Sequence, residues 1–346
     1  RRRSRSSSSS SYQAARKKKT SKKRKDVETV SASSSATRQQ PKRLAREDSV
    51  LAGATSNLGL SSSFSSRSSY GIKDLHLSAS VFATADMEAL NVIFIPASSA
   101  EEVIPDIRVT EFPEQYILPN INRQILANGE LDVRRLEGIS KPKVQTFLNK
   151  LNKVVVNGMQ AIGTDESFTD TYVDNLLRIS KLDIFPLGIR NRPPHKLYIQ
   201  DVACVTSVPD FVIEKKNNKN RDINIVVIGD KHLRSIGPSN GFGETQLAAE
   251  ILASGSENIR TIREYRDQTL WAVRIISTYV TFYKALIPAV YWEELGKNLP
   301  KKQSITIQRW PANFKTSFDF AQPEGRREVF TALAKIREAL LREEGE

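Results

Sequence analysis

Apolar and polar residues alternate with two different periods along residues 136–346, which predicts a mixed α/β domain. Apolar residues recur at helical spacing in four segments, 141–159, 165–180, 244–253 and 325–346. Short apolar runs that predict strands occupy residues 91–96, 196–205, 208–214, 224–229 and 305–308. The polar stretch 215–222 separates two of these runs and is typical of a hairpin loop. Between residues 165 and 253 the predicted order is therefore helix, three strands and helix.

The longest apolar stretch, Trp271–Trp292, contains Arg274 and Lys284. Its length would suit a membrane span, and its aromatic residues would suit a base-stacking surface. The two charges and several hydroxyl groups favour a buried protein core instead. Further on, Arg309 follows the predicted strand 305–308 and is expected to cap the sheet.

The first 135 residues divide into two parts by composition. Residues 1–70 are rich in Ser, Lys and Arg and hold few large apolar residues. Such a segment cannot bury enough surface to offset its chain entropy, so we expect a disordered tail. Residues 71–135 have a globular composition, and we expect an accessory segment that packs on the domain formed by residues 136–346.

Positive charge is concentrated in the tail. Residues 1–50 carry 16 Lys and Arg against 4 Asp and Glu, which is +12 of the whole chain's net +13. The run Arg16–Lys25, RKKKTSKKRK, is typical of a nuclear import signal or of non-specific phosphate binding. The rest of the chain is nearly neutral, so its charge does not by itself indicate nucleic-acid binding.

Cysteine and histidine are scarce. Cys204 is the single cysteine of the sequence, which excludes a disulfide framework and a cysteine-based zinc site and favours a reducing compartment. The three histidines, His76, His195 and His232, are too scattered for a histidine-rich metal site. No secretory signal is predicted, and a membrane-bound protein is not expected.

Polar residues stand at corresponding places on four of the predicted elements. Asp210 follows a proline at the start of one strand, and Lys231 ends its hairpin partner. Glu166 lies near the start of the preceding helix, and Gln246 and Glu250 share a face of the following helix. Mg²⁺ prefers oxygen ligands, and phosphodiester hydrolysis also needs a cation where negative charge develops.

Each of these residues is unremarkable alone. Proline-aspartate is a common turn pair, a strand-end lysine is usually solvated, and an acid near a helix start is favoured by the helix dipole. Helical spacing places Glu166 in line with Val173 and Leu177, so we expect its side chain to point inward. The combination of order and spacing is what indicates a phosphodiesterase site.

The order helix, three strands, helix with these residues resembles the PD-(D/E)XK nuclease superfamily over residues 160–255. The resemblance implies a restriction-endonuclease-like fold, in which a mixed central sheet is flanked by helices. It also implies catalytic roles for Glu166, Asp210, Lys231 and Gln246, and Mg²⁺ or Mn²⁺ held by Glu166 and Asp210, with Glu250 as a further candidate ligand. DNA, in preference to RNA, is the implied partner, and protein partners are compatible with the near-neutral domain.

More narrowly, the sequence is similar to the nuclease-like C-terminal regions of Crinkler-type effectors. The similarity runs from ESFTDTYVDNLLR through VPDFVIE, VVIGDKHL and GETQLAAEILA to ITIQRWP. The leucine-phenylalanine-leucine-alanine-lysine signature of those effectors is absent from the sequence given. The basic run Arg16–Lys25 predicts a nuclear location, and secretion as an effector stays open.

One position departs from the superfamily pattern. The acid-any-lysine triplet reads Gly229-Asp230-Lys231, and strand alternation directs position 229, not 230, to the side of Lys231. Glu250 could supply the missing carboxylate from the following helix, as in superfamily members with a migrated acid. Alternatively, a bulge at Gly229 could turn Asp230 inward. In the third interpretation the site is degenerate, and the domain is a non-catalytic binding, effector or protein-interaction module.

Overall fold

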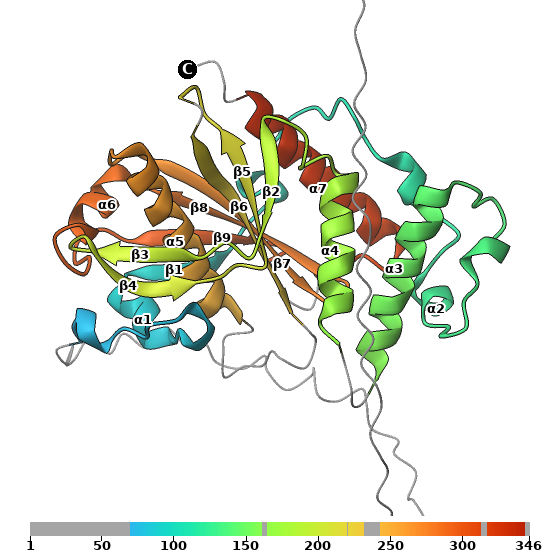
Figure 1. The fold of residues 1–346 in the computed structure, drawn as a ribbon, viewed down its shortest axis with the longest axis horizontal. Helices are drawn as coiled ribbons and strands as arrows, with labels where there is room; N and C mark the ends of the chain where they lie inside the picture. The colour runs from blue at the N-terminus through green and yellow to red at the C-terminus, as the bar shows by residue number, and fades with distance from the viewer. Residues whose placement is uncertain (1–69, 161–164, 220, 232–242, 313–316, 343–346) are drawn as a thin grey trace, which may run out of the picture. The chain divides into compact units, whose positions relative to one another are not determined.

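A mixed β-sheet of eight strands forms the centre of the computed structural model (Figure 1). The structure describes residues 70–160, 165–219, 221–231, 243–312 and 317–342, without the side chains of Val227, Asp230 and Lys231. The predicted tail, its basic run and His232 lie outside these residues. The main strands follow the order β1-β9-β8-β7-β6-β5-β2, and β10 pairs with β8. The pairs β1/β9 and β6/β7 are parallel, and the other pairs in the sheet are antiparallel.

The strands of the sheet are β1 (Val92–Pro96), β2 (Leu187–Asn191), β5 (Phe211–Lys216), β6 (Asp222–Lys231), β7 (Gln268–Ile276), β8 (Tyr279–Ile287), β9 (Ile305–Trp310) and β10 (Phe318–Asp319). A separate hairpin comprises β3 (His195–Ile199) and β4 (Val202–Ser207). The helices are α1 (Thr84–Ala89), α2 (Arg123–Leu126), α3 (Pro142–Met159), α4 (Ser167–Ile179), α5 (Glu244–Ile262), α6 (Ala289–Leu295) and α7 (Pro323–Arg342).

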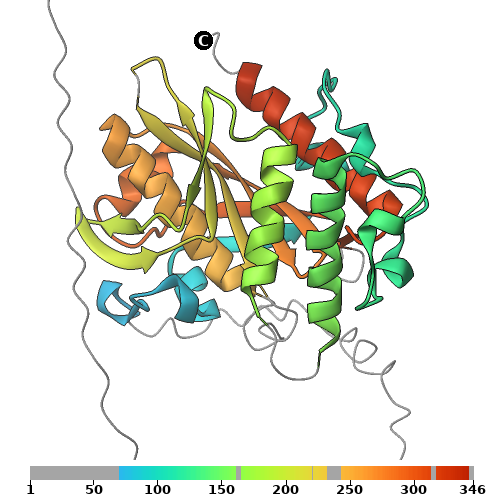
Figure 2. The same cartoon turned by 45° about the vertical axis from the view of Figure 1, so that its right-hand side comes forward.

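The two faces of the sheet carry different helices (Figures 1 and 2). Buried residues of α3, α4 and α7 pack against one face, where Val226, Ile228 and Val273 contribute to the core. Buried residues of α5, α6 and the β3–β4 hairpin pack on the other face, with Ala272 and Tyr283. The alternation of side chains along each strand therefore serves two separate cores.

Most of the predicted elements are confirmed. The predicted helices at 141–159 and 165–180 are α3 and α4, and the predicted strands at 91–96 and 305–308 are β1 and β9. The prediction of one strand over 196–205 was wrong, because Gln200 and Asp201 have positive φ angles and form the turn between β3 and β4. Helix α5 extends to Ile262, beyond its predicted end, and β2 was not predicted.

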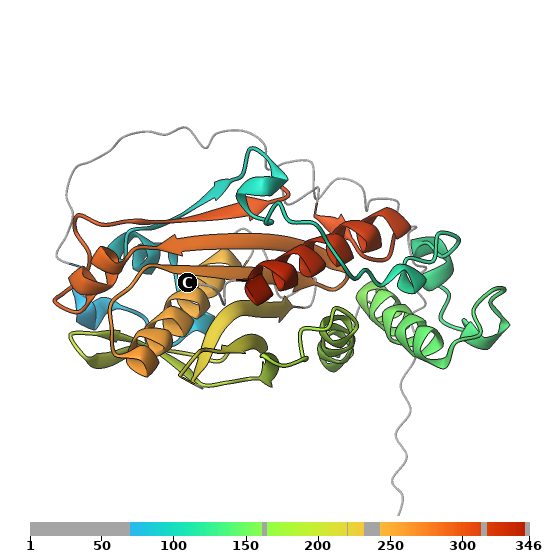
Figure 3. The same cartoon turned by 90° about the horizontal axis from the view of Figure 1, so that it is seen from above.

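Residues 71–135 and 136–346 belong to one compact unit. Strand β1, from the segment expected to be accessory, is the edge strand beside β9 (Figure 3). The two segments on either side of residue 135 therefore share one sheet. Among the described helices, none has the length and apolar character that crossing a bilayer would need.

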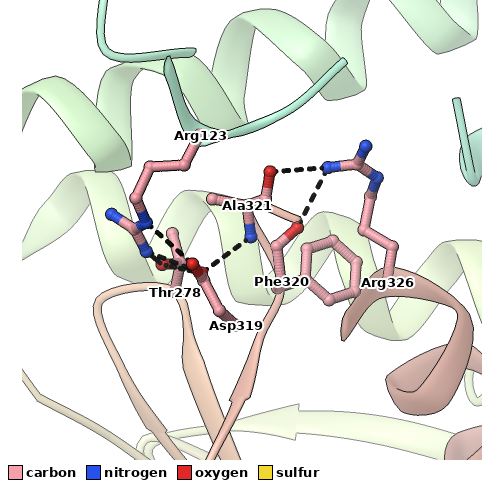
Figure 4. Close-up of polar contacts among 6 residues, drawn as sticks. All are labelled: Arg123, Thr278, Asp319, Phe320, Ala321 and Arg326. Atoms are coloured by element: carbon pink, nitrogen blue, oxygen red, sulfur yellow. Dashed lines mark hydrogen bonds and ion pairs between the residues drawn. The ribbon is translucent and has the colours of Figure 1, made fainter. Parts of the chain in front are cut away.

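Two arginines fix the early segment to the rest of the unit (Figure 4). Arg123 makes a two-point ion pair with Asp319 of β10. Arg326 of α7 is fully buried. It donates to the backbone carbonyl of Ile117 in the early segment and to that of Phe320 next to β10. Burial lowers the pKa of Arg326 to about 10, so the side chain is still charged at neutral pH. Because its acceptors are carbonyl groups, this arginine has a structural role.

A neutral polar network crosses the C-terminal half of α5. The Asn258 side chain accepts the backbone N–H of Asn224 and donates to its carbonyl, both at 2.8 Å. It also donates to Gln268, which in turn donates to the Gly255 carbonyl. Asn258 thereby satisfies the backbone of β6 just before the β6/β7 ladder begins.

Candidate functional site

Asp210 and Gly229 lie at the same end of the β5/β6 pairing. The last paired residues of β5 and β6 are Phe211 and Ile228, so Asp210 stands just before β5 and Gly229 just beyond this pairing. Phe211 and Ile228 point into the core on the α4 side. The alternate position of β6, Gly229, therefore faces the other side of the sheet, where α5 lies. The backbone carbonyl of Asp210 accepts the N–H of Arg192, which extends the pairing with β2.

Glu250 of α5 occupies the space left by the absent side chain of Gly229. A Cβ atom at position 229 would stand 3.4 Å from Oε2 of Glu250. Glu250 is only 2% exposed, and Gln246 donates to its other oxygen, Oε1, at 2.6 Å. The helical spacing of four residues makes this contact possible. The carboxylate of Glu250 therefore lies against the space that a side chain at position 229 would enter.

Gly229 lies within a regular parallel ladder. It pairs with Arg274 of β7, and the pairing continues without a shift through Asp230 with Ile275 and Lys231 with Ile276. This regular register speaks against a bulge at Gly229. The side chains of Asp230 and Lys231 lie outside the described part of the structure, so the predicted direction of each stays a prediction.

Arg274 of β7 is the ladder partner of Gly229. Its neighbours Val273 and Ile275 belong to the α4-side core, so Arg274 projects to the α5 side. It is 3% exposed, and its guanidinium lies 5.5 Å from the centre of the Tyr283 ring. Burial raises the pKa of Tyr283 far above its usual range, although the positive charge of Arg274 opposes this shift.

Glu244, the first residue of α5, forms an ion pair with Arg309 of β9. Arg309 donates to Glu244 at 2.8 Å and also to the carbonyl of Ala312. The two paired side chains are largely buried, at 13% and 11% exposure. The expectation that Arg309 caps the sheet was wrong, because it lies within β9 and pairs with Tyr283 of β8. Its role is to fix the start of α5 over the sheet.

Glu166 is less closely connected to this site. It precedes the first residue of α4 and is exposed, so the prediction that it points inward was wrong. One turn further along, Asp170 forms an ion pair with Arg192, whose N–H bonds to Asp210. The start of α4 is therefore linked to the Asp210 corner, although α4 packs on the opposite face of the sheet.

The oxygen donors at this corner suit a hard divalent cation. Glu250 adjoins Gly229 and Asp210 directly precedes β5 at the same end of the β5/β6 pairing, and carboxylate oxygen is the ligand type that Mg²⁺ and Mn²⁺ prefer. The space beside Gly229 is reached by Oε2 of Glu250, while Gln246 holds Oε1. Within the described ranges, no group of three or more His, Cys, Asp or Glu side chains is arranged to hold a metal. A divalent cation at this corner would therefore have two protein carboxylates as ligands, and water or substrate would supply the other ligands.

The chain matches no known protein-family model and no curated protein. The assignment of a function therefore depends on the geometry of the site.

Sequence reasoning missed Arg274, Glu244 and Arg309 as members of this site. Arg274 interrupts an otherwise apolar run, and a charge inside a predicted core segment is a signal that could have identified it. No comparable local signal marks Glu244 or Arg309, since their pairing joins positions far apart in the sequence.

Proposed function

We propose that this protein is a PD-(D/E)XK-like phosphodiesterase in which Glu250 takes the place of the strand acid missing at Gly229. The observation that carries the proposal is the approach of Glu250 Oε2 to the position of a residue 229 side chain. The regular β6/β7 register and the burial of Glu250 support it. A buried carboxylate beside a glycine in the middle of a charged corner has a high desolvation cost, which a functional role would explain.

Each residue has a distinct role in the proposed reaction. Asp210 and Glu250 would hold Mg²⁺ or Mn²⁺, which when bound supplies Lewis-acid stabilisation of the phosphate and an acidified water molecule. Gln246 orients Glu250 by binding Oε1. Strand alternation directs Lys231 to the face of Gly229, where its ammonium group would orient the attacking water and stabilise negative charge on the phosphate. Glu166 would contribute only through a second-layer contact from the start of α4.

DNA is the proposed substrate in preference to RNA, and a nuclear location is proposed from the basic run Arg16–Lys25. The tail would add non-specific contacts to phosphate groups, so its contribution should weaken steeply with added salt. The near-neutral composition of the rest of the chain means that affinity would depend on the tail while cleavage depends on the site.

The decisive experiment moves the acid between the helix and the strand. Cleavage of DNA and RNA with Mg²⁺ or Mn²⁺ is measured for the wild type, Glu250→Gln, Lys231→Ala and the double variant Gly229→Glu/Glu250→Ala. We expect the wild type to cleave, the two single variants to lose at least about a hundredfold in rate, and the double variant to recover part of it. Glu293→Gln, on the exposed surface of α6, is the matched control.

A second candidate is a non-catalytic nucleic-acid-binding or protein-interaction module on the same fold. The glycine at position 229 favours it, because the acid expected on the strand is missing. If the wild type binds nucleic acid but does not cleave it, and Gly229→Glu alone gains metal-dependent cleavage, the second candidate is correct. The proposal of an active enzyme would then be abandoned.

A further inference from the structure

The solvent-facing side of α3 carries three lysines, and the helix contains no acidic residue. Lys143 and Lys153 are exposed, and Lys150 is partly exposed. At about 100° per residue, the three lie within about 80° of one another around the helix axis. Along the axis they extend over about 15 Å, because each residue advances the helix by about 1.5 Å. These three residues are called the α3 lysine row.

The α3 lysine row differs from other exposed cations on this side of the sheet. On the neighbouring elements, Arg178 of α4 forms an ion pair with Asp174, and Arg190 of β2 forms one with Glu214. In the part of the chain that the structure describes, no member of the row forms an ion pair with an acid. Like charges three or four residues apart on a helix repel one another, so an anion that binds across the row relieves this repulsion.

The end of the row lies at the same end of the unit as the proposed site. Lys153 is in the last two turns of α3, and its Nζ lies 5.9 Å from the centre of the Phe168 ring in the first turn of α4. The end of α3 and the starts of α4 and α5 all lie toward the bottom of two views (Figures 1 and 2). Asp170 of α4 forms an ion pair with Arg192, whose N–H bonds to the carbonyl of Asp210. A duplex bound at the site from this end would therefore pass close to α3.

Resting on the function proposed above for the identity of the ligand, we propose that the α3 lysine row binds the phosphate backbone of the DNA substrate beside the site. Each strand of a duplex carries one phosphate per about 3.4 Å of its axis, so about 15 Å of α3 corresponds to about four phosphates. Lysine suits this task, because its ammonium group binds phosphate without reading the bases. The tail would supply most of the affinity, whereas contacts from a folded helix fix the orientation of the duplex over the site.

The test measures DNA binding separately from cleavage. A fluorescent duplex of about 30 base pairs is titrated at several salt concentrations with the full-length protein in EDTA, which removes the metal and so prevents cleavage. The variant is Lys143→Gln/Lys150→Gln/Lys153→Gln. We expect its Kd to rise by about tenfold near 0.1 M salt, and the slope of log K against log salt to fall by about two to three. Melting temperatures show whether each protein is folded. If the triple variant is unfolded, Lys153→Gln is used instead and should lower the slope by about one.

The matched control removes the same amount of charge from another surface. It replaces by Gln three exposed lysines in the loop between α6 and β9, on the α5 side of the sheet, namely Lys297, Lys301 and Lys302. This control should change Kd by less than about twofold and leave the slope nearly unchanged.

Equal losses in the α3 variant and in the control would show that only the net charge matters, and the inference would be overturned. A loss seen with single-stranded RNA of the same length but not with the DNA duplex would overturn the choice of partner. Absence of cleavage by the wild type in Mg²⁺ and Mn²⁺ would instead overturn the proposed function, because the titrations in EDTA do not depend on cleavage.

Discussion

The two halves of α5 lie on the same face of the same sheet, but the N-terminal half buries charged groups and the C-terminal half buries neutral polar groups. The N-terminal half presents Glu244 and Glu250, and arginines from β7 and β9 lie on the same face. The C-terminal half buries Ser254 and Asn258, which bond to neutral groups of β3, β6 and β7. The neutral half resembles ordinary architecture, in which each donor has a matching acceptor.

The difference teaches which buried polar groups indicate function. A neutral amide network stabilises a fold at modest cost, whereas buried carboxylates are costly to desolvate and are retained mainly where their charge is used. Arg326 supports the same distinction from another region, because its acceptors are backbone carbonyls and its role is structural. A buried charged side chain therefore indicates function only when the chemical type of its partner is also considered.

The largest effect is expected in the neutral half. Asn258→Ala leaves the backbone N–H and carbonyl of Asn224 and the side-chain oxygen of Gln268 without their partner. Each lost partner costs about 1 kcal/mol or more, so we expect the free energy of unfolding in urea to fall by about 3–4 kcal/mol. Arg260→Ala, exposed two residues further on, should change it by less than about 1 kcal/mol. Equal effects of the two substitutions would contradict a structural network.

A pH effect is expected from His195 of β3, which contacts Ser254 in the neutral half of α5. Its Nδ1 atom is 2.9 Å from the Ser254 hydroxyl, and burial, with a smaller effect of Arg190, lowers its pKa to about 4. The unfolded chain binds a proton near pH 6.5 while the folded protein does not, so stability should fall as the pH drops from 6.5 toward 4.

The part of this loss due to His195 should be about 2–3 kcal/mol. Chemical denaturation at several pH values would measure it, with His195→Gln as the comparison. In that variant the pH dependence should become flatter. A slope identical to that of the wild type would show that the pKa of His195 does not change on folding.

In the charged half, the expected effect appears only when metal is present. Mn²⁺ at ten times its dissociation constant should stabilise the wild type by about 1.4 kcal/mol, because the ion binds only the folded protein. Glu250→Gln removes one of the two proposed carboxylate ligands and should abolish this gain. Thermal unfolding with and without Mn²⁺ measures it. Equal stabilisation of both proteins would remove Glu250 from the metal site.

The smallest effect is expected from filling the space at Gly229. Its Cβ would meet only the flexible carboxylate of Glu250 at 3.4 Å, so Gly229→Ala should change the free energy of unfolding by less than about 1 kcal/mol. Gly255→Ala is the matched glycine of the neutral half, where a Cβ would stand 2.7 Å from the Trp292 ring. That substitution should cost about 1–3 kcal/mol in urea denaturation. A larger loss at Gly229 than at Gly255 would show that the charged half is the more rigidly packed.

Sequence alone determined the helices α3, α4 and α7, the strands β1 and β9, and the buried character of Trp271–Trp292. Local periodicity determines such features, because the side chains that share a face are close in sequence. It also identified Asp210, Gln246 and Glu250 as candidates and Gly229 as the departure. It failed at Gln200, where a tight turn of non-glycine residues interrupts an apolar run.

Tertiary structure decided how those candidates meet. The pairing of Gly229 with Arg274 and the reach of Glu250 over Gly229 join residues that lie far apart along the chain. Strand register and the placement of α5 fix these contacts, and both depend on the packing of the whole sheet rather than on local propensity. The sequence pattern also did not predict that Glu166 is exposed or that Arg309 forms an ion pair with Glu244. Both features depend on which residues are neighbours in space rather than in sequence.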